Sequence, residues 1–250
     1  MSEPVRLALW QVALGVAILA AWDVLGRIIG TTWISSPALV TARLSTWLSG
    51  DLYVNVFTTL EEVAAGLALG TVLGIAAGLV LGRAPLLAHI LRPLIFGIYS
   101  VPLIALAPLF IMFFGLDMAP KIVLVALVVF FLMFFNTLAG AQAVDEDLIA
   151  TLELMGANRR EIFQNVIAPA CMVWIIGGLK IALPYALVAA TTGEILAARR
   201  GMGFLLSDAA QKYNMTSLYA ALFVLALMGL MVAGAAVQLE KRMLKWRHAT

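Results

Sequence analysis

The chain has 250 residues, of which 63% are hydrophobic and only 12% are charged. A soluble domain carries about 25% charged residues, so this composition excludes an ordinary soluble protein and indicates an integral membrane protein. The formal net charge of +2 is too small to favour a nucleic-acid partner. The single cysteine, Cys171, excludes an intrachain disulfide framework and is expected to be an apolar filler.

Apolar runs long enough to cross a bilayer recur along the chain, each with the roughly 20 mainly apolar residues that a span requires. Six are predicted, at about 7–29, 58–82, 94–114, 121–141, 171–196 and 218–239. No low-complexity segment or long linker separates them, so residues 1–250 are expected to form one transmembrane domain. The predicted fold class is therefore an all-α membrane protein with about six transmembrane helices and both termini on one side.

Glycine recurs at every fourth residue along the second run, at Gly66, Gly70, Gly74, Gly78 and Gly82. On an α-helix this spacing drifts by about 40° per step, so the glycines form one smooth stripe. A stripe of small residues lets another helix approach closely, which is how helices associate where lipid removes the hydrophobic driving force. The stripe is either a static packing contact or a sliding contact that changes during a transport cycle.

Prolines mark two irregular places. Ser35-Ser36-Pro37 predicts a turn and a helix start, followed by a short interfacial helix over residues 38–48. Pro102 and Pro108 lie inside the third run, where each removes a backbone donor. They predict a kinked or broken helix, which either lies beside a polar path or only helps packing.

Polar groups inside the runs are candidates for a solute path, because charges inside a bilayer are costly. Lys180 is interpreted as the only charged residue well inside a run, where it would either attract an anionic solute or extend toward the cytoplasm. Glu194 lies about 21 Å further along the same helix, too far to pair with Lys180. It is either an external gate group or an interfacial acid beside Arg199 and Arg200. The pathway candidates, for which helix–helix contact is the alternative role, are Tyr99, Ser100, Asn136, Lys180, Tyr185, Thr192 and Glu194.

One long polar stretch, residues 145–169, separates the fourth and fifth runs. Its sequence predicts two short helices that meet at Gly156 and end at Pro169. Acidic residues start the first helix at Asp145-Glu146-Asp147, and Asn158 caps the second. The stretch is either a docking element that enters a groove of a soluble partner or an ordinary interfacial connector.

The positive-inside rule places this stretch in the cytoplasm. With the termini inside, the cytoplasmic basic residues are Arg6, Arg83, Arg92, Arg159, Arg160, Lys241, Arg242, Lys245 and Arg247. The smaller external set is Arg27, Arg43, Lys121, Arg199, Arg200 and Lys212. Met155 and Phe163 are then available to pack below the membrane.

The polar stretch resembles the cytoplasmic EAA loop of ATP-binding-cassette (ABC) importer permeases, which reads EAA, three residues, Gly, nine residues and I-x-L-P. Gly156 matches the glycine, and Val166-Ile167-Ala168-Pro169 matches the terminal element. Ala150-Thr151-Leu152 replaces Glu-Ala-Ala, which leaves Glu153 and Asp147 as the nearby acids. PLIFGIYSVPLIALAPLFIMFFG, FFNTLAGAQAVD and GGLKIALPYALVAATTGEILAARRGMGFLL resemble the nitrate/sulfonate/taurine-type branch, and the resemblance covers about residues 5–247.

This resemblance implies a type I ABC importer permease fold with a coupling helix between the fourth and fifth spans. It implies a bacterial inner-membrane protein that pairs with a second permease copy, a cytoplasmic ABC ATPase dimer and an external solute-binding protein. ATP and magnesium would bind to the ATPase. This chain has no G-x-x-x-x-G-K-[ST] motif and is expected to bind no cofactor or metal and to be no enzyme. Contacts with the ATPase are expected from Asp147, Glu153, Met155, Gly156, Ala157, Arg160, Phe163 and Pro169.

The resemblance also implies a small anionic or organic solute. The branch suggests nitrate, sulfonates or taurine, whereas LPYALVAATTGEI is more similar to members associated with thiamine-precursor pyrimidines, riboflavin or aromatic acids. The alternative is a secondary transporter or channel that works without an ATPase. That alternative leaves the EAA-like loop unexplained, and the sequence lacks an inverted repeat.

Overall fold

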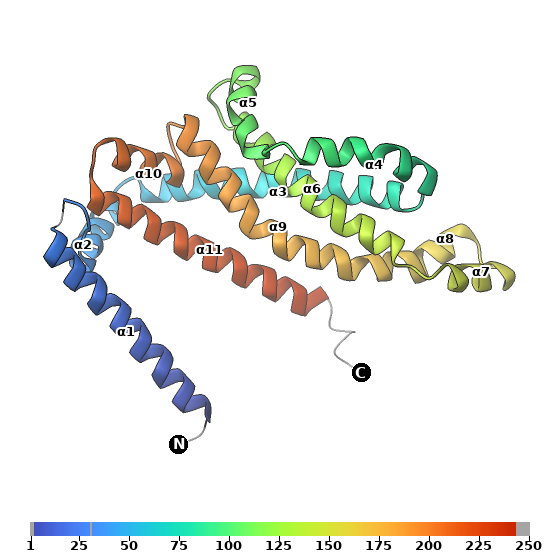
Figure 1. Cartoon of the computed structure of the whole chain (residues 1–250), viewed down its shortest axis with the longest axis horizontal. Coiled ribbons are helices and arrows are strands. Elements are labelled where there is room, and N and C mark those ends of the chain that lie inside the picture. The colour runs from blue at the N-terminus through green and yellow to red at the C-terminus, as the bar shows by residue number, and fades with distance from the viewer. Residues whose placement is uncertain (1–2, 31, 244–250) are drawn as a thin grey trace.

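The computed structural model describes residues 3–30 and 32–243, and within them every regular element is helical (Figure 1). The six long helices are α1 (Glu3–Ile29), α3 (Leu52–Gly82), α4 (Pro85–Tyr99), α6 (Ala119–Gln142), α9 (Ala168–Ala197) and α11 (Met215–Met243). The shorter elements are α2 (Pro37–Leu48), η1 (Leu103–Leu106), α5 (Ala107–Phe114), α7 (Glu146–Leu154), α8 (Arg159–Ile162), η2 (Phe163–Ile167) and α10 (Met202–Gln211). Lys245 and Arg247, which entered the prediction of orientation, lie outside the described residues.

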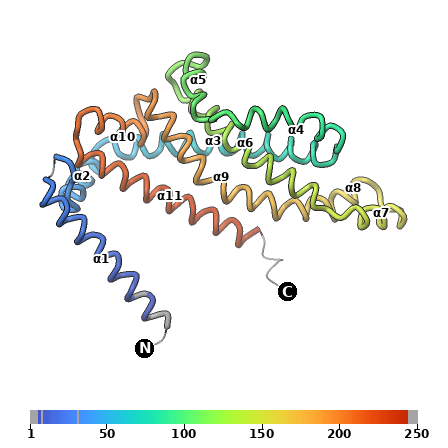
Figure 2. The backbone as a smooth tube through the Cα atoms, viewed as in Figure 1, coloured from blue at the N-terminus to red at the C-terminus, as the bar shows by residue number. Residues whose placement is uncertain are grey.

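The bundle is elongated, with α6 packed between α3 and α9, and α11 on the far side of α9 (Figures 1 and 2). Helices α2 and α10 lie at one end, which we call the α10 end, and α7 and α8 lie at the other, the α7–α8 end. Helix α1 diverges from the bundle, and its apolar side chains are largely exposed. Exposed apolar surface of this kind suits contact with lipid rather than water.

The predicted number of spans is confirmed. Five helices among the described residues are long and apolar enough to cross a membrane, and a sixth span is possible from the bent pair Pro85–Tyr99 and Leu103–Phe114. The two halves of that pair meet at 73°, as expected of a run interrupted by proline. Pro102 precedes the short 3₁₀ turn η1, and Pro108 stands in the first turn of α5, where a missing N–H costs nothing. The break confirms the predicted broken helix.

The glycine stripe lies against α6 along most of the length of α3. Gly66, Gly70, Gly74 and Gly78 are buried, and each faces α6 backbone or Cβ atoms. A Cβ added at Gly74 would lie 2.7 Å from the Met133 Cβ and 2.7 Å from the Phe130 carbonyl oxygen. No side chain fits in this space, so the predicted close approach of another helix is confirmed.

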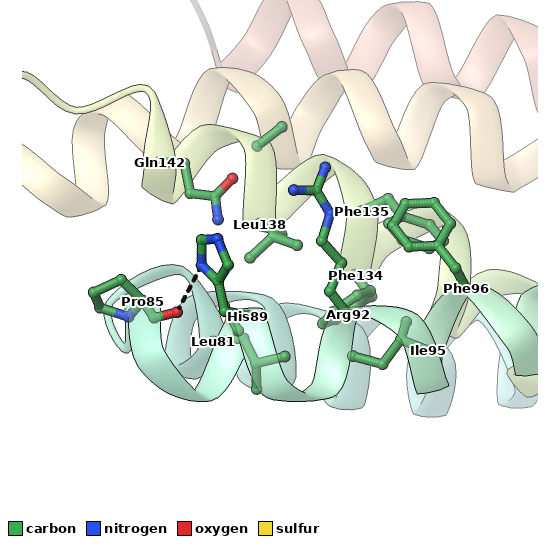
Figure 3. A pocket seen from close by; sticks show the side chains of 12 residues that line it. Leu81, Pro85, His89, Arg92, Ile95, Phe96, Phe134, Phe135, Leu138 and Gln142 are labelled. Carbon is green, nitrogen blue, oxygen red and sulfur yellow. Dashed lines mark hydrogen bonds between the residues drawn. The ribbon is translucent and has the colours of Figure 1, made fainter.

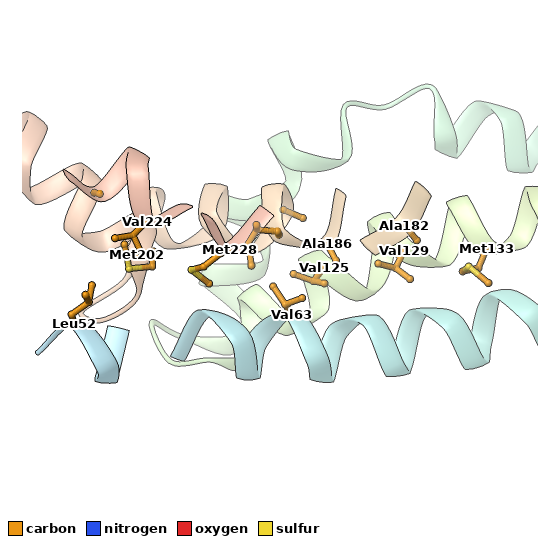
Figure 4. Close-up of a cluster of buried hydrophobic side chains, with 14 residues drawn as sticks. Leu52, Val63, Val125, Val129, Met133, Ala182, Ala186, Met202, Val224 and Met228 are labelled. Carbon is orange, nitrogen blue, oxygen red and sulfur yellow. The ribbon is translucent and has the colours of Figure 1, made fainter. Parts of the chain in front are cut away.

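The apolar core continues from this contact toward α9, α10 and α11 (Figure 4). Val125, Val129 and Met133 of α6 lie beside the α3 glycines and belong to one buried cluster with Ala182 and Ala186 of α9. Small residues again occur on the side of α9 that meets α6, which brings the helices close without large side chains. Helix α6 is therefore the central element around which α3 and α9 are positioned.

Replacement of Gly74 by alanine should destabilise the bundle, because the new Cβ would overlap Met133 and Phe130. Overpacking of this kind costs about 1–3 kcal/mol. Gly177→Ala on α9 is the matched control, since nothing lies within 4 Å of its added Cβ. Thermal unfolding in detergent should show a lower Tm for Gly74→Ala only, and equal Tm values for both variants would contradict the close contact.

Candidate functional site

The 145–169 loop begins as a capped helix. The Asp145 carboxylate accepts a hydrogen bond from the Asp147 N–H at 2.9 Å, which satisfies a free donor of the first turn of α7. Helix α7 ends at Leu154, and Gly156, two residues later, has a φ of +88° in the left-handed region. The Ala157 N–H donates to the Leu152 carbonyl and the Gly156 N–H to the Glu153 carbonyl, a pairing that closes helices of this kind. Glycine is thus required at the join by the backbone itself.

The second part of the loop begins with a reciprocal cap. The Asn158 side chain accepts from the backbone N–H groups of Arg160 and Glu161 at 3.0 Å each. The Glu161 carboxylate in turn accepts from the Asn158 N–H at 2.8 Å. The predicted cap at Asn158 is confirmed.

The prediction that Pro169 ends the second helix is wrong. Pro169 stands in the first turn of α9, and the chain remains helical from Arg159 to Ala197 over 39 residues. The wider turn η2 makes this possible, with a bond from the Ala168 N–H to the Phe163 carbonyl five residues earlier. Since proline lacks an N–H and crowds the preceding turn, a local widening before it preserves the helix.

Apolar contacts hold the loop against the ends of α6 and α9. Ile149, Ile162 and Ile167 are buried against Ala141, Val144 and Cys171. Cys171 is fully buried, which confirms its predicted role as an apolar filler. The loop is therefore a packed unit of the protein and not a loose connector.

The predicted contact residues are distributed over the open side of this unit. Met155 is 78% exposed, and its neighbour Leu154 is 90% exposed. Phe163 is 42% exposed, so part of its ring is also open to a partner. Of the other predicted contact residues, the exposed ones are Asp147, Glu153, Gly156, Arg160 and Pro169, while Ala157 is half-buried in the apolar cluster. Leu154 is not among the predicted contact residues.

Three of the pathway candidates lie around one cavity. Tyr99, Ser100 and Tyr185 line a space of about 480 Å³ between α4, α6 and α9. Asn136 is absent from that lining and donates to the Leu132 carbonyl at 2.8 Å. Thr192 lines a separate space of about 390 Å³ beside α11. The structure thus brings together only part of the predicted set.

The interpretation of Lys180 as the only charged residue well inside a span is wrong, because Glu62 is buried within α3. The Lys180 ammonium group pairs with Glu240 of α11 at 2.7 Å, and both side chains are partly exposed. A pair of this kind neutralises the lysine and contributes little to stability. Glu194 in contrast is 1% exposed, so it is not an interfacial acid beside Arg199 and Arg200.

Two buried charges, Glu62 of α3 and Lys121 of α6, are not among the predicted pathway candidates. Their carboxylate and ammonium groups lie 2.6 Å apart, with side-chain exposures of 0% and 6%. Glu62 falls four residues before Gly66, so it continues the glycine stripe onto the face toward α6. Its neighbour Glu61 is exposed. The periodicity of the stripe was the signal that could have identified the buried acid.

Glu194 belongs to a second set of buried polar contacts at the α10 end. Its carboxylate accepts from the Thr59 hydroxyl at 2.7 Å and from the Gly203 N–H at 2.6 Å. The Met202 N–H donates to the Thr59 hydroxyl oxygen at 2.9 Å, and the Gly201 N–H donates to the Asn55 side chain at 2.7 Å. These bonds fix the start of α10 against α3. Together with the Glu62–Lys121 pair they form what we call the buried polar network, which joins α3, α6, α9 and α10.

Comparison with known proteins places these features in a family. Residues 70–245 match the family described as "Binding-protein-dependent transport system inner membrane component". The chain is 29% identical over 231 residues to the formylaminopyrimidine transport permease protein ThiX of Halalkalibacterium halodurans, covering 92% of each chain. It is 30% identical over 255 residues to the putative aliphatic sulfonates transport permease protein SsuC of Escherichia coli, covering 100% of this chain and 97% of the other.

A solved structure confirms the fold. The chain aligns with one from the MetNI methionine ABC transporter in inward-facing conformations, with a TM-score of 0.67 and 18% identity. The alignment covers 77% of this chain and 95% of the other. The predicted type I ABC importer permease fold is therefore correct. The protein belongs to the binding-protein-dependent transport system inner membrane components, the permease subunits of ABC importers.

Proposed function

We propose that the protein is one of two identical permease subunits of an importer for a small anionic or organic solute. An external binding protein delivers the solute at the α10 end. A cytoplasmic ATPase dimer, which binds ATP and magnesium, engages the 145–169 loop at the opposite end. ATP-driven movement of this loop alternates access to the solute path. The sulfonate and formylaminopyrimidine permeases among the relatives support a small organic solute.

The observation that carries this proposal is the exposure of Leu154 and Met155 on a well-packed loop. These large apolar side chains lie at the tip of a loop that is capped and is held in place by a buried apolar cluster. Side chains in such a position are suited to a groove on a partner. Acidic Asp147 and Glu153 and basic Arg160 are also exposed on the loop, which provides charges for orienting that partner.

A continuous helix connects the 145–169 loop to the α10 end of the bundle. Helical backbone runs from Arg159 to Ala197, about 58 Å at 1.5 Å per residue. Near its far end Glu194 is bonded into the buried polar network. Displacement of α8 would therefore act on α9 directly and on the α9–α10 connection through Glu194.

The distribution of basic residues supports the orientation with the α7–α8 end in the cytoplasm. Lys121 was counted as an external loop charge, but it is buried in the ion pair with Glu62. Its removal from the external set increases the cytoplasmic excess. Lys241 and Arg242 in the last turn of α11 lie on the proposed cytoplasmic side, as both termini would. The alternative of a transporter or channel without an ATPase has no support from the family match.

Reconstitution tests the proposed function as a whole. The permease is combined in proteoliposomes with its ATPase and binding protein, and uptake of taurine, butanesulfonate and a thiamine-precursor pyrimidine is measured. We expect uptake of at least one of these classes that requires ATP. Uptake at the same rate without the ATPase would contradict the proposal.

Leu154→Asp should weaken the contact with the ATPase without affecting the fold, because the side chain is 90% exposed in the permease alone. Loss of one buried leucine contact and burial of a charge should reduce affinity by about tenfold or more. Retention of the ATPase during purification measures the effect. Leu116→Asp is the control, an exposed leucine in the turn between α5 and α6. Equal retention of the ATPase by both variants would exclude Leu154 from the contact.

Lys121→Met should destabilise the protein strongly, because it leaves the Glu62 carboxylate buried without its cation. Breaking one side of a buried pair costs about 3–5 kcal/mol. The double variant Lys121→Met/Glu62→Gln should recover most of the loss. Lys180→Met, which removes the exposed pair with Glu240, should cost at most about 1 kcal/mol. Thermal unfolding of the four proteins checks this order, and similar losses for Lys121→Met and Lys180→Met would overturn it.

A further inference from the structure

A second cavity lies between α4 and α6 near the α7–α8 end, and no role assigned so far accounts for it. Its volume is about 260 Å³, smaller than the sites that hold drug-sized ligands. Leu81 of α3 and six α4 residues, among them His89 and Arg92, line one side. Phe134, Phe135, Leu138 and Gln142 of α6 line the other. The space therefore suits a small molecule or a single head group.

Among the described residues, the polar side chains that line this cavity are basic or neutral, and none is acidic. Figure 3 shows the Arg92 guanidinium, the His89 ring and the Gln142 amide directed into the space between the two helices. Arg92 carries the only permanent charge among the lining residues, and no carboxylate of the described chain lines the cavity. The guanidinium and amide N–H groups provide several hydrogen-bond donors around one positive charge, while the His89 Nδ1–H donates to the Pro85 carbonyl oxygen.

Part of the apolar lining of the cavity is aromatic. The Arg92 guanidinium carbon lies 5.8 Å from the centroid of the Phe96 ring, within the range of a cation–π contact. Phe96 packs on Phe135 at 5.4 Å between centroids, and Phe135 packs on Tyr99 at 5.0 Å. Tyr99 in turn lines the cavity that holds Ser100 and Tyr185. An aromatic layer thus separates two cavities that follow one another along α4.

We propose that the Arg92 cavity binds an oxyanion group, a sulfonate, carboxylate or phosphate, attached to a small apolar body. A planar guanidinium with five donors matches such a group in two-point contact, and the Gln142 amide supplies a further donor. The Phe96, Phe134 and Phe135 rings receive the apolar body. Placement of this site on the solute path rests on the function proposed above, whereas the binding itself does not.

Two sources provide this chemistry, an organic acid in transit and the phosphate of an anionic lipid. The test uses the full permease–ATPase complex in nanodiscs of phosphatidylcholine alone or with phosphatidylglycerol. Benzenesulfonate is the soluble probe and benzenesulfonamide is its neutral match. Binding is measured by calorimetry, and the Tm is recorded in both lipids.

In phosphatidylcholine, benzenesulfonate should bind at least about tenfold more tightly than benzenesulfonamide, because only the sulfonate forms charge-assisted bonds to Arg92. Arg92→Gln should reduce sulfonate affinity by about tenfold or more, and Arg92→Lys by less. Arg83→Gln, which removes an exposed charge from the adjacent α3–α4 turn outside the cavity, should leave affinity unchanged. Because Arg92 is exposed, these variants are expected to fold.

The lipid arm identifies the second source. If a lipid phosphate occupies the cavity, phosphatidylglycerol should raise the Tm of the wild type and of Arg83→Gln but not of Arg92→Gln, and should weaken sulfonate binding. Either Arg92-dependent effect supports the oxyanion site. The oxyanion site would be overturned if neither sulfonate binding nor the rise in Tm with phosphatidylglycerol depended on Arg92. That result is expected if a carboxylate of a second permease copy pairs with Arg92. Uptake by the reconstituted importer is scored separately, so loss of binding with transport retained rejects this site and leaves the proposed function standing.

Discussion

The close approach of α3 and α6 is the contact on which the rest of the bundle depends. Gly66, Gly70, Gly74 and Gly78 leave no room for side chains, so the two backbones lie against each other. In lipid, where apolar side chains gain nothing by leaving the solvent, such backbone contact is a main source of helix association. Glu62 extends the same face toward the α10 end and meets Lys121 there. One face of α3 therefore combines the glycine stripe with the buried Glu62–Lys121 pair.

The Glu62–Lys121 pair limits how far α3 can move along α6. A smooth glycine surface would permit α3 to slide along α6, but a shift by one helical turn is about 5.4 Å and would separate the Glu62 and Lys121 groups. Separation of two buried charges is costly. The buried polar network thus favours movements in which α3 and α6 keep their register while other elements rearrange. Helix α9, which is bonded to the network by Glu194 and continues into the 145–169 loop, is the element best placed to transmit such a rearrangement.

Much of this arrangement could be predicted from the sequence because it depends on local rules. Hydropathy predicted the spans, and the four-residue spacing of glycines predicted the glycine stripe. The residue type of Asn158 predicted a cap at the start of the second loop helix. The start of α3 at Leu52, before the expected residue 58, could not be predicted from hydropathy, because Asn55 in this first part is polar yet buried against protein. The partner of Lys180 was equally inaccessible, since Glu240 is sixty residues away and meets it only through the packing of α9 on α11. The prediction at Pro169 was wrong because the widened turn η2 accommodates the proline without ending the helix.

That widened turn also fixes the direction in which the loop projects. A wider helical turn holds an additional residue, and each residue of an α-helix rotates the chain by about 100°. The face that Leu154 and Met155 present therefore depends on the number of residues between Phe163 and Ile167 as well as on the apolar contacts that hold the loop. A relative with one residue fewer in this turn would carry the same loop sequence on a different side of the helix axis. Alignments of such permeases are thus informative about loop orientation through their insertions and deletions as well as their substitutions.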